Sequence, residues 1–403
     1  MNQRNYHMKS LQIVGNARYG GATYLMLEWS KYLVERGYQV DIVCTDEIMV
    51  QKANEIPGIR VIDSIYMPRE IKPGVDLKAF AQLISLMRQE QYHVVHTYTA
   101  VPSFLGRFAA TLSRMPVIVN HQGGWSVGDQ SSFVERLFFT PLEYLATVAC
   151  TKNICVSHAE KDKALQFGLA PERKLVTIVN GLDTKPFVEA YQKRDRAEFL
   201  ASLGVPEDHF VMGNTGRLVA GKGNETLVEA VHLLNKNRRA DERPYTLLLA
   251  GDGVGRSKLE ALIKELNVEN NVKLLGFWKE IPKFLANIDV FITPSLSEGL
   301  SISLLEAMAA KCPIISSNIP PNAEVVLDEE CGILVPTNDP LAIKEAVLRY
   351  GQSQNLAETY SKNSQQRALS YFTLERMFDE TWQLYNELLQ EKGYKPASVM
   401  AST

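Results

Sequence analysis

The sequence predicts an α/β protein that consists of two doubly wound parallel sheets. Short apolar runs alternate with amphipathic stretches in two successive series, a pattern typical of parallel strands joined by helices. The chain has 403 residues, more than one domain of about 150 residues, which favours at least two domains. With 45% hydrophobic and 22% charged residues, the composition is that of a soluble globular protein and excludes disordered, collagen-like and coiled-coil chains.

The first series predicts an amino-terminal domain over residues 1–185. It opens with a strand at residues 11–14, a helix at residues 22–36 and a second strand at residues 39–43. Helical patterns then separate four more predicted strands, at residues 94–96, 116–120, 153–156 and 175–178.

The second series predicts another domain of the same architecture over residues 208–370. Between the two series the chain is charged and lacks strand character, so we expect a linker at residues 186–207. Each predicted strand of the second series is followed by a helical segment. These strands lie at residues 210–214, 246–250, 272–275, 290–293 and 313–316.

A last helix is expected over residues 371–392. Its large apolar residues recur at spacings near three and four, so one face of the helix should be buried. That face consists of Phe378, Trp382, Tyr385 and Leu389. Residues 393–403 are expected to form a flexible tail.

The charge and the cysteines narrow the class of protein. The net charge of −3 gives no general reason to bind nucleic acid. No apolar run approaches the roughly 18 residues of a transmembrane helix, and the start of the chain lacks a signal-peptide pattern, so we expect a cytoplasmic protein. The five cysteines are scattered and sit in apolar contexts, which predicts buried, reduced thiols.

A glycine-rich loop follows the first strand. Residues 15–22 include Gly20 and Gly21 and lead directly into a helix. Such glycines let a backbone approach a phosphate group at a helix N-terminus. A tight turn that merely requires small residues is the alternative, and the spacing alone does not decide between the two.

The second domain opens with a similar loop that carries two cations. Residues 216–223 nearly match the P-loop of nucleotide hydrolases, but Gly223 stands where the P-loop has Ser or Thr. Without that hydroxyl the charge of a diphosphate would be met by Arg217 and Lys222. No Asp-x-Asp pair for a magnesium-bound sugar diphosphate occurs in the chain, so no metal is expected. Two solvated surface cations are the alternative.

Two carboxylates flank the start of a predicted helix in the second domain. Glu298 and Gly299 lie in the loop after a strand, a helix starts near Ser301, and Glu306 falls in its second turn. Unpaired amides at a helix start can accept a phosphate, and carboxylates can accept hydrogen bonds from sugar hydroxyls. This arrangement suits a sugar nucleotide. Alternatively, Glu306 is solvated and Glu298 caps the helix.

Other candidate residues carry weaker signals. His121 ends a strand of the first domain, where both a structural and a catalytic role are open. His93 and His96 have a metal-like spacing, but on a strand they point to opposite faces, so we do not expect a metal site. The residues 251–255 resemble a dinucleotide fingerprint without its third glycine, and we expect a turn there.

An apolar stripe marks a predicted helix of the first domain. Phe133, Leu137, Phe138 and Leu142 recur at helical spacing. Core packing is the commoner reason for such a stripe. Contact with a membrane that holds a lipid-linked acceptor is the alternative.

Together these motifs resemble the retaining glycosyltransferases of family 4. The similarity covers most of the chain and rests on an ordered set rather than on one motif. The set comprises Gly20-Gly21, Asn180-Gly181-Leu182-Asp183, Gly216-Arg217, Lys222-Gly223, Glu298 with Glu306, Glu324, Cys331-Gly332, Pro336 and Asp339-Pro340. The resemblance implies the GT-B fold, in which two Rossmann-like domains face a central cleft and the last helix crosses back to the first domain.

The resemblance also implies roles for single residues. Arg217 and Lys222 would bind the donor diphosphate, Glu298 would contact the transferred sugar, and Glu306 would bind the ribose hydroxyls. The donor-binding set is completed by Gly20 and Gly21, which would close over the phosphates from the other domain, and by Gly216, Phe277, Gly299, Leu300 and Ser301. Phe277 lies where such enzymes hold the base, and His121 matches a histidine near the reacting carbon.

The activity implied is transfer of a hexose or N-acetylhexosamine with retention and without metal or cofactor. The donor would be a nucleotide diphosphate sugar, with UDP favoured over GDP, and the acceptor a saccharide or lipid-linked saccharide of the cell surface. The chain departs from the family pattern at Thr23 and Gly221, which should not carry the chemistry. It also departs at Ser301 and Ser303, beside Glu298, so the family does not predict which sugar the donor carries. Alternatives are a hydrolysing epimerase, a phosphorylase, a P-loop ATPase and a sugar-nucleotide-binding module without activity.

Overall fold

The protein consists of two compact units, seen here in a computed structural model. The structure describes residues 8–128, 131–236, 238–239 and 242–395. Residues up to Val179, together with those from Met377 onward, form the first unit, and residues from Asn180 to Arg376 form the second. Most of the predicted tail, residues 396–403, lies outside the described residues.

The first unit contains a parallel sheet of seven strands within the described residues, in the order β3-β2-β1-β4-β5-β6-β7. The order reverses between β1 and β4, as in a doubly wound fold. Almost every residue of the central strand β1 is buried, which fits a strand covered on both faces. The strands are β1 (Lys9–Gly15), β2 (Gln39–Cys44), β3 (Ile59–Ile62), β4 (Val94–Thr97), β5 (Val117–Gln122), β6 (Lys152–Cys155) and β7 (Leu175–Thr177).

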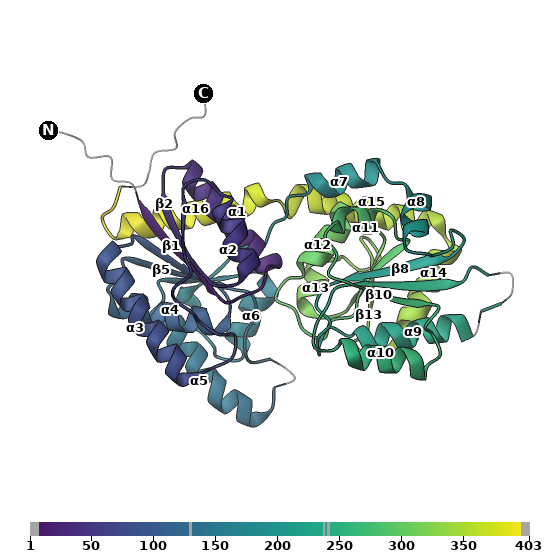
Figure 1. Ribbon diagram of the computed structural model, residues 1–403, viewed down its shortest axis with the longest axis horizontal. Coiled ribbons are helices and arrows are strands. Elements are labelled where there is room, and N and C mark those ends of the chain that lie inside the picture. The colour runs from purple at the N-terminus through teal and green to yellow at the C-terminus, as the bar shows by residue number, and fades with distance from the viewer. Residues whose placement is uncertain (1–7, 129–130, 237, 240–241, 396–403) are drawn as a thin grey trace. The chain divides into compact units, whose positions relative to one another are not determined.

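Helices cover both faces of this sheet (Figure 1). Leu11 and Ile13 of β1 pack in a core with Leu83 of α3 and Ala109 of α4, while the alternate side chains of β1 face α1 and α16. The helices are α1 (Gly21–Glu35), α2 (Glu47–Asn54), α3 (Pro73–Glu90), α4 (Ala100–Leu112), α5 (Phe133–Ala149), α6 (His158–Gln166), the 3-10 turn Glu172–Lys174, and α16 (Leu374–Glu391), of which residues from 377 belong here.

The last helix, α16, packs on α1 through aromatic rings. Trp29 meets Tyr385 edge to face at 5.3 Å between ring centroids, and Tyr32 lies 4.9 Å from Phe378. All four residues of the predicted apolar face, Phe378, Trp382, Tyr385 and Leu389, are buried. The predicted burial of this helix face is therefore confirmed.

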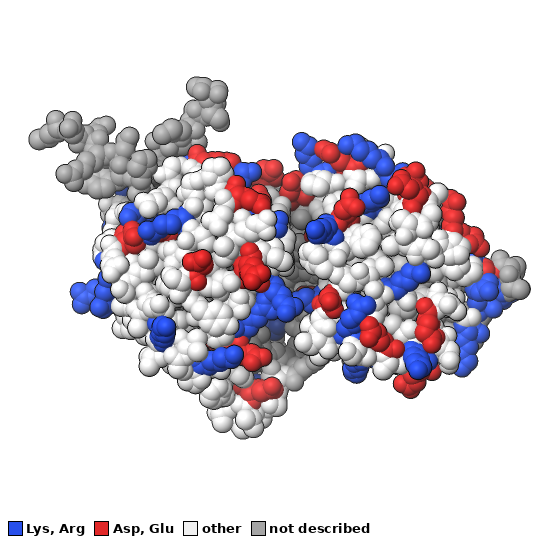
Figure 2. Space-filling view, in the orientation of Figure 1, with Lys and Arg blue, Asp and Glu red and all other residues white. Residues whose placement is uncertain are grey.

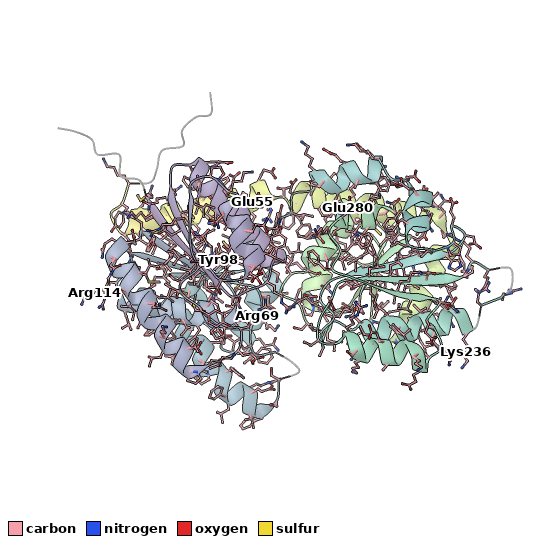
Figure 3. All side chains as sticks on the ribbon, in the orientation of Figure 1. Glu55, Arg69, Tyr98, Arg114, Lys236 and Glu280 are labelled. Atoms are coloured by element: carbon pink, nitrogen blue, oxygen red, sulfur yellow. The ribbon has the colours of Figure 1, made fainter. Side chains whose placement is uncertain are left out.

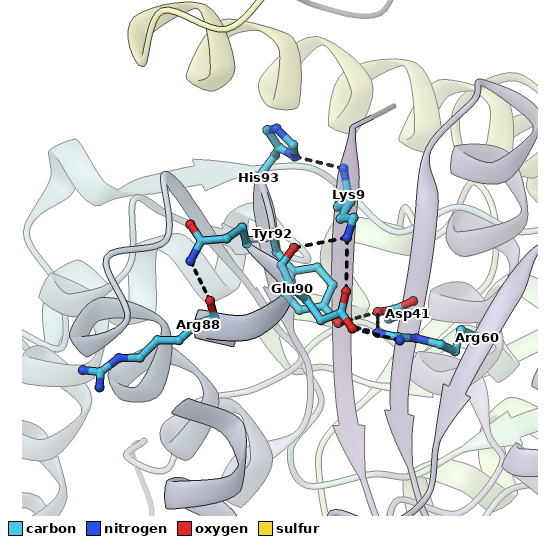
Figure 4. Close-up of polar contacts among 8 residues, drawn as sticks. Lys9, Asp41, Arg60, Arg88, Glu90, Tyr92 and His93 are labelled. Carbon is cyan, nitrogen blue, oxygen red and sulfur yellow. Dashed lines mark hydrogen bonds and ion pairs between the residues drawn. The ribbon is translucent and has the colours of Figure 1, made fainter. Parts of the chain in front are cut away.

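A polar cluster closes the amino-terminal edge of the first sheet (Figure 4). Asp41 of β2 is fully buried and accepts hydrogen bonds from Arg60 and from the Tyr92 hydroxyl. Glu90 at the end of α3 pairs with Arg60 at 3.0 Å and with Lys9 at 3.1 Å, and these cations lower its pKa. The cluster ties β1, β2, β3 and α3 together at the edge opposite the strand ends where ligands bind.

The second unit repeats the architecture with six strands among the described residues, in the order β10-β9-β8-β11-β12-β13. The order reverses between β8 and β11. The strands are β8 (Phe210–Thr215), β9 (Tyr245–Ala250), β10 (Val272–Gly276), β11 (Val290–Thr293), β12 (Ile314–Ser317) and β13 (Ile333–Val335). The helices are α7 (Lys185–Gln192), α8 (Arg196–Ser202), α9 (Asn224–Lys236), α10 (Arg256–Glu265), α11 (Ile281–Ala286), α12 (Ile302–Ala309), α13 (Pro320–Val325), α14 (Pro340–Gln352) and α15 (Gln354–Tyr371).

Residues 186–207, which we expected to form a linker, carry helices α7 and α8 of the second unit. Their charges have structural partners. Asp195 caps α8 through the Glu198 amide at 3.0 Å, and Arg196 pairs with Asp289 at 2.8 Å. A charged stretch therefore reflects helix capping and packing here rather than an extended connection.

The chain crosses between the units at two places that meet in a β-bridge. Leu182 donates its N–H to the Phe372 carbonyl at 2.9 Å, and Leu182 and Thr373 form a parallel bridge. A Cβ at Gly181 would lie 2.1 Å from the Thr373 oxygen, so this close approach requires glycine. The Asn180 to Asp183 motif thus connects the segment that enters the second unit to the segment that leaves it.

The predicted cysteine chemistry is confirmed, because all five thiols are free and buried. Among the described residues, no helix combines the length and the apolar character that crossing a membrane requires.

Candidate active site

The carboxyl ends of β8 and β11 meet where the strand order of the second sheet reverses. The strands pair in register, with Met212 opposite Val290 and Gly213 opposite Phe291. Ligands of open parallel sheets bind outside the strand ends at such a reversal. The loop after β8 (residues 216–223) and the loop after β11 (residues 294–301) both lie there.

An ion pair connects these two loops. The Lys222 ammonium lies 2.5 Å from the Glu298 carboxylate, and both side chains are largely shielded from solvent. A backbone hydrogen bond from Leu296 to the Gly221 carbonyl, at 2.8 Å, joins the same loops. The pair excludes two alternatives: Lys222 is not an isolated surface cation, and Glu298 does not cap the next helix.

Gly223 is required by the close approach of the two loops. It adopts a φ of +70°, and a Cβ there would lie 2.3 Å from the Pro294 carbonyl oxygen. A Ser or Thr of a P-loop therefore does not fit at this position.

Residues 251–255, which follow the adjacent strand β9, contact the loop after β8. A Cβ at Gly251 would lie 1.7 Å from the Gly216 carbonyl oxygen, and the Gly255 amide donates to the Leu218 carbonyl at 2.8 Å. α10 begins directly afterwards, at Arg256. The expectation of a turn at these glycines is confirmed.

Arg217 lies in the same loop and is exposed. Its guanidinium has no ion-pair partner among the residues that the structure describes. The group is thus available to an anionic ligand beside the Lys222 and Glu298 pair.

The helix after Glu298 begins with uncapped amides. Ser301 occupies the N-cap position of α12 without a side-chain cap, and its hydroxyl instead lies 3.0 Å from that of Ser303. Leu300 and Ser301 are buried. Orphan N–H groups at such a helix start attract negative charge.

Glu306 lies in the second turn of α12, as predicted. Its side chain is partly buried, and withdrawal from water raises its pKa to about 8. At neutral pH this carboxyl therefore holds its proton in the ligand-free protein and can both donate and accept hydrogen bonds.

Phe277 follows strand β10 and is 66% exposed. Beside it, the indole N–H of Trp278 is buried without a hydrogen-bond partner among the described residues. An exposed aromatic ring at a strand end offers a face on which a nucleobase can stack.

The remaining predicted residues belong to the first unit. Gly20 precedes α1, where the Thr23 hydroxyl accepts from its amide at 2.8 Å. A Cβ at Gly20 would meet nothing within 4 Å, so packing does not require glycine there, and Gly21 is the first residue of the helix. The bare backbone at residue 20 leaves room for a ligand.

His121 lies at the carboxyl end of β5. Its ring centroid is 5.5 Å from that of Tyr98, which lies inside the first unit (Figure 3). Tyr98 was not predicted as a site residue, since a tyrosine directly after a strand carries no chemical signal without its neighbours.

His93 and His96 have separate partners in the first unit. His93 accepts a hydrogen bond from the Lys9 amide at 3.0 Å, whereas His96 contacts the Tyr385 hydroxyl at 2.8 Å. Within the described residues, no group of three or more His, Cys, Asp or Glu side chains is arranged to hold a metal ion.

Two family models match the two halves of the chain. The model described as Glycosyltransferase Family 4 matches residues 19–186, and the model Glycosyl transferases group 1 matches residues 195–367.

Curated relatives align over most of their length. The UDP-Gal:alpha-D-GlcNAc-diphosphoundecaprenol alpha-1,3-galactosyltransferase of Escherichia coli is 29% identical over 325 residues, or 80% of this chain and 83% of that protein. The capsular polysaccharide biosynthesis glycosyltransferase CapM of Staphylococcus aureus is 26% identical over 377 residues, covering 92% and 96%.

The fold also matches solved structures. Anabaena Alr3699/HepE, in complex with UDP and glucose, superposes with a TM-score of 0.80 at 20% identity and covers 94% of this chain and 100% of that one. At this identity the likeness concerns the fold.

Proposed function

The chain belongs to the family 4 glycosyltransferases and has their GT-B fold, and we propose that it transfers a hexose or N-acetylhexosamine from a nucleotide diphosphate sugar to a saccharide hydroxyl. The observation that carries the proposal is the Lys222 and Glu298 ion pair at the strand reversal of the second unit. The pair places a cation that can bind a diphosphate next to a carboxylate that can accept hydrogen bonds from sugar hydroxyls.

We favour a UDP-sugar as donor, with a GDP-sugar second. The Escherichia coli relative is named for UDP-Gal, and the Anabaena neighbour binds UDP and glucose. In the proposed complex the base stacks on Phe277 and the ribose hydroxyls bond to Glu306.

The leaving diphosphate gains negative charge as its bond to the sugar breaks. Arg217, Lys222 and the amides at the start of α12 stabilise that charge, since donors arranged before the reaction need no reorganisation during it. No metal takes part in this scheme, because the two cations and the amides serve the diphosphate.

Glu298 binds different partners before and after the donor is bound. In the ligand-free protein it holds the Lys222 ammonium. When the ammonium turns to the diphosphate, the carboxylate accepts hydrogen bonds from the hydroxyls of the transferred sugar. The two loops are thereby positioned before the donor arrives.

Transfer proceeds with retention. The bond from the anomeric carbon to the diphosphate oxygen breaks while the acceptor oxygen bonds to that carbon from the same face. The acceptor proton passes to the leaving phosphate oxygen, so no enzyme carboxylate forms a bond to the sugar.

The acceptor is a lipid-linked saccharide at the cytoplasmic face of a membrane. The relative named above acts on a diphosphoundecaprenol-linked sugar. Of the apolar stripe on α5, Phe133 is 78%, Leu137 67% and Phe138 60% exposed, so core packing does not explain these three residues. Few charges mark the tip of the first unit where α5 begins (Figure 2).

A transfer assay tests the proposal. Purified protein is incubated in EDTA with UDP-galactose, UDP-glucose, UDP-N-acetylglucosamine or GDP-mannose and a synthetic diphospholipid-linked N-acetylglucosamine, and products are separated by chromatography and mass. We expect a new glycoside, with its anomeric configuration, read by NMR, equal to that of the donor.

Other products would assign another activity. Free sugar or an epimerised donor would indicate a hydrolysing epimerase, and phosphate-dependent cleavage a phosphorylase. Binding of UDP or GDP with no product at all would indicate a binding module without activity, and calorimetry with UDP, GDP, ADP and ATP, each in EDTA and in magnesium, measures that binding. Binding of ATP alone, and only with magnesium, would contradict the proposal.

A further inference from the structure

A buried polar cluster lies beside His121 in the first unit. Parallel pairing sets Gln12 opposite His96 and His96 opposite Val119. Since side chains alternate across a strand, Tyr98 and His121, each two residues further along, share the face of His96. The topology therefore gathers three rings at the carboxyl ends of β4 and β5.

The three rings are in contact with one another. The rings of His96 and Tyr98 stack at 4.4 Å between centroids, and the Tyr98 ring lies 5.5 Å from that of His121. The His96 and His121 rings are 6.2 Å apart. His96 and Tyr98 are almost completely buried, so their positions are fixed by packing.

The last helix holds this cluster through Tyr385. The Tyr385 hydroxyl lies 3.3 Å from the Trp29 indole N–H, which donates to it, and 2.8 Å from His96 Nδ1. The Tyr98 hydroxyl donates to Gln12 Oε1 at 2.9 Å. The same Nδ1 lies 3.2 Å from the Tyr98 hydroxyl, and burial lowers the pKa of His96 well below its usual range.

That arrangement leaves a buried ring nitrogen unsatisfied. His96 Nε2 has no hydrogen-bond partner among the described residues. Such a group costs about 1–3 kcal/mol, which an apolar residue would avoid. The polar cluster is therefore not explained by stability alone, and its neighbour at the strand ends is His121.

We propose that Tyr98, His96 and Tyr385 are positioning residues that fix the ring of His121, so that the last helix of the chain supports the site of the first unit. The inference rests on the proposed function in one respect, the place of His121 near the reacting carbon. The rings do not touch the donor in this scheme; they act through His121.

Two variants that remove one oxygen each test the inference. Tyr98→Phe and Tyr385→Phe keep the rings and lose the hydrogen bonds. We expect kcat to fall by about tenfold while KM for the donor stays within about twofold, as for a misplaced catalytic side chain. Tyr32→Phe is the matched control, because its hydroxyl also reaches the last helix, through Asp379 at 3.1 Å, without contacting His96.

A double-mutant cycle separates positioning from a general structural role. In the His121→Ala background, Tyr98→Phe should cause no further loss of kcat, because the residue that it positions is gone. Equal losses in both backgrounds would overturn the proposal, as would a loss equal to that of Tyr32→Phe. If Tyr385→Phe does not fold, Tyr98→Phe alone decides.

Histidine NMR keeps the test independent of activity. With 13C-labelled histidine, Tyr98→Phe should shift the His121 ring signal and its titration midpoint, and Tyr32→Phe should leave both unchanged. A His121 signal that is identical in Tyr98→Phe and the parent would refute the positioning role even if no transfer is found. If the signal shifts while His121→Ala turns over normally, the proposed role of His121 fails and the structural coupling stands.

Discussion

Single residues at the strand reversal of the second unit link two loops that the chain keeps 76 positions apart. The ion pair of Lys222 and Glu298 is largely shielded from solvent, and the cost of removing two charges from water offsets much of their attraction, so the pair is weak evidence for stability. We therefore attribute the pair to ligand binding rather than to stability. Both loops are further held by the close contact of Gly223 with Pro294.

Lys222→Ala is expected to weaken UDP binding by about tenfold to a hundredfold, because a charge-assisted hydrogen bond to phosphate contributes about 1.5–3 kcal/mol. Arg217→Ala should act in the same direction. Calorimetric titration with UDP in EDTA measures both. Lys258→Ala is the control, since Lys258 pairs with Glu225 on an exposed surface of the same unit at 3.2 Å. Affinities of all three variants equal to that of the parent protein would show that the clamp is misassigned.

The carboxyl of Glu306 makes stability depend on pH. Its pKa is about 8 in the folded chain against an ordinary value of 4.5. Between these values the folded state binds a proton that the unfolded state releases, so the free energy of unfolding falls as pH rises, by up to about 1.4 kcal/mol per unit. Glutamine stays neutral at every pH. The free energy of unfolding of Glu306→Gln should therefore increase relative to that of the parent protein between pH 5 and pH 8. Urea titrations at both values measure the gain.

Glu329→Gln is the matched control for that experiment. Arg349 and Tyr360 lower the pKa of Glu329 to about 2. The ionised Glu329 carboxylate contributes fully to stability above pH 4.5, and this contribution is lost only as pH falls towards 2. The change in the free energy of unfolding caused by Glu329→Gln should therefore be equal at pH 5 and pH 8. A Glu306→Gln effect that is likewise constant would contradict the burial of that carboxyl.

Residue chemistry was only partly predictable from the sequence. The types and loop positions of Lys222, Glu298 and Glu306 follow from motif spacing. Their pairing does not, because it depends on β8 and β11 being neighbours, which the order of strands along the chain does not state. The burial of Tyr385 was predicted from helix periodicity, but its contact with His96 was not, since the two residues meet only through the packing of α16 on β4.

At the scale of elements, α5 is unusual because most of its large apolar side chains face solvent. The N-terminus of α5 is stabilised by a capping box that the Ser132 hydroxyl and the Glu135 carboxylate form. Of its residues only Ala146 and Thr147 are buried. The apolar face is thus presented by a stable helix and is a candidate surface for a membrane.

Replacing Phe133, Leu137 and Phe138 with Ser should reduce sedimentation with vesicles of phosphatidylglycerol and phosphatidylethanolamine by about tenfold or more, because each apolar side chain contributes about 1.5–3 kcal/mol on burial. Turnover on a water-soluble acceptor should not change. Vesicle sedimentation and the two assays with soluble and lipid-linked acceptors measure the effect.

The matched control replaces Val254 and Leu341 with Ser. Both residues are exposed in the second unit, where no apolar stripe surrounds them. If the α5 variant still sediments like the parent, the helix does not meet the membrane. If the parent alone forms a dimer that the α5 variant loses, a second copy covers this face instead.

Elements with strong apolar periodicity were predictable, and so was the short edge strand β7, whereas the edge strands β3 and β13 were not. No strand was predicted at β3 or β13, which have four and three residues at the edges of their sheets. Such strands are held by pairing with a neighbour more than by their own pattern. The helices α7 and α8 were likewise hidden, because charge alone resembles a linker.

At the scale of the whole molecule, the two units share one plan. Each sheet reverses its strand order once, and each reversal carries a glycine-bearing loop and candidate site residues. The repeated alternation in the sequence was enough to predict this duplication. The start of the second unit was harder, because the charged residues at 186–207 resemble a linker but carry α7 and α8 of that unit, whereas the return of the last helix to the first unit was implied by the family resemblance.

This return of the chain makes the first unit depend on its last residues. Seven apolar side chains of α16 are buried, from Met377 to Leu389, and at about 1.5–3 kcal/mol each their loss approaches the whole stability of a domain, about 5–15 kcal/mol. A chain that ends at Arg376 should therefore lose hydrogen-exchange protection in β1, β4 and β5 while β8, β9 and β11 stay protected. A chain that ends at Lys395 is the control and should keep both sets. Protection of all six strands in the shorter chain would mean that the first core folds without its last helix.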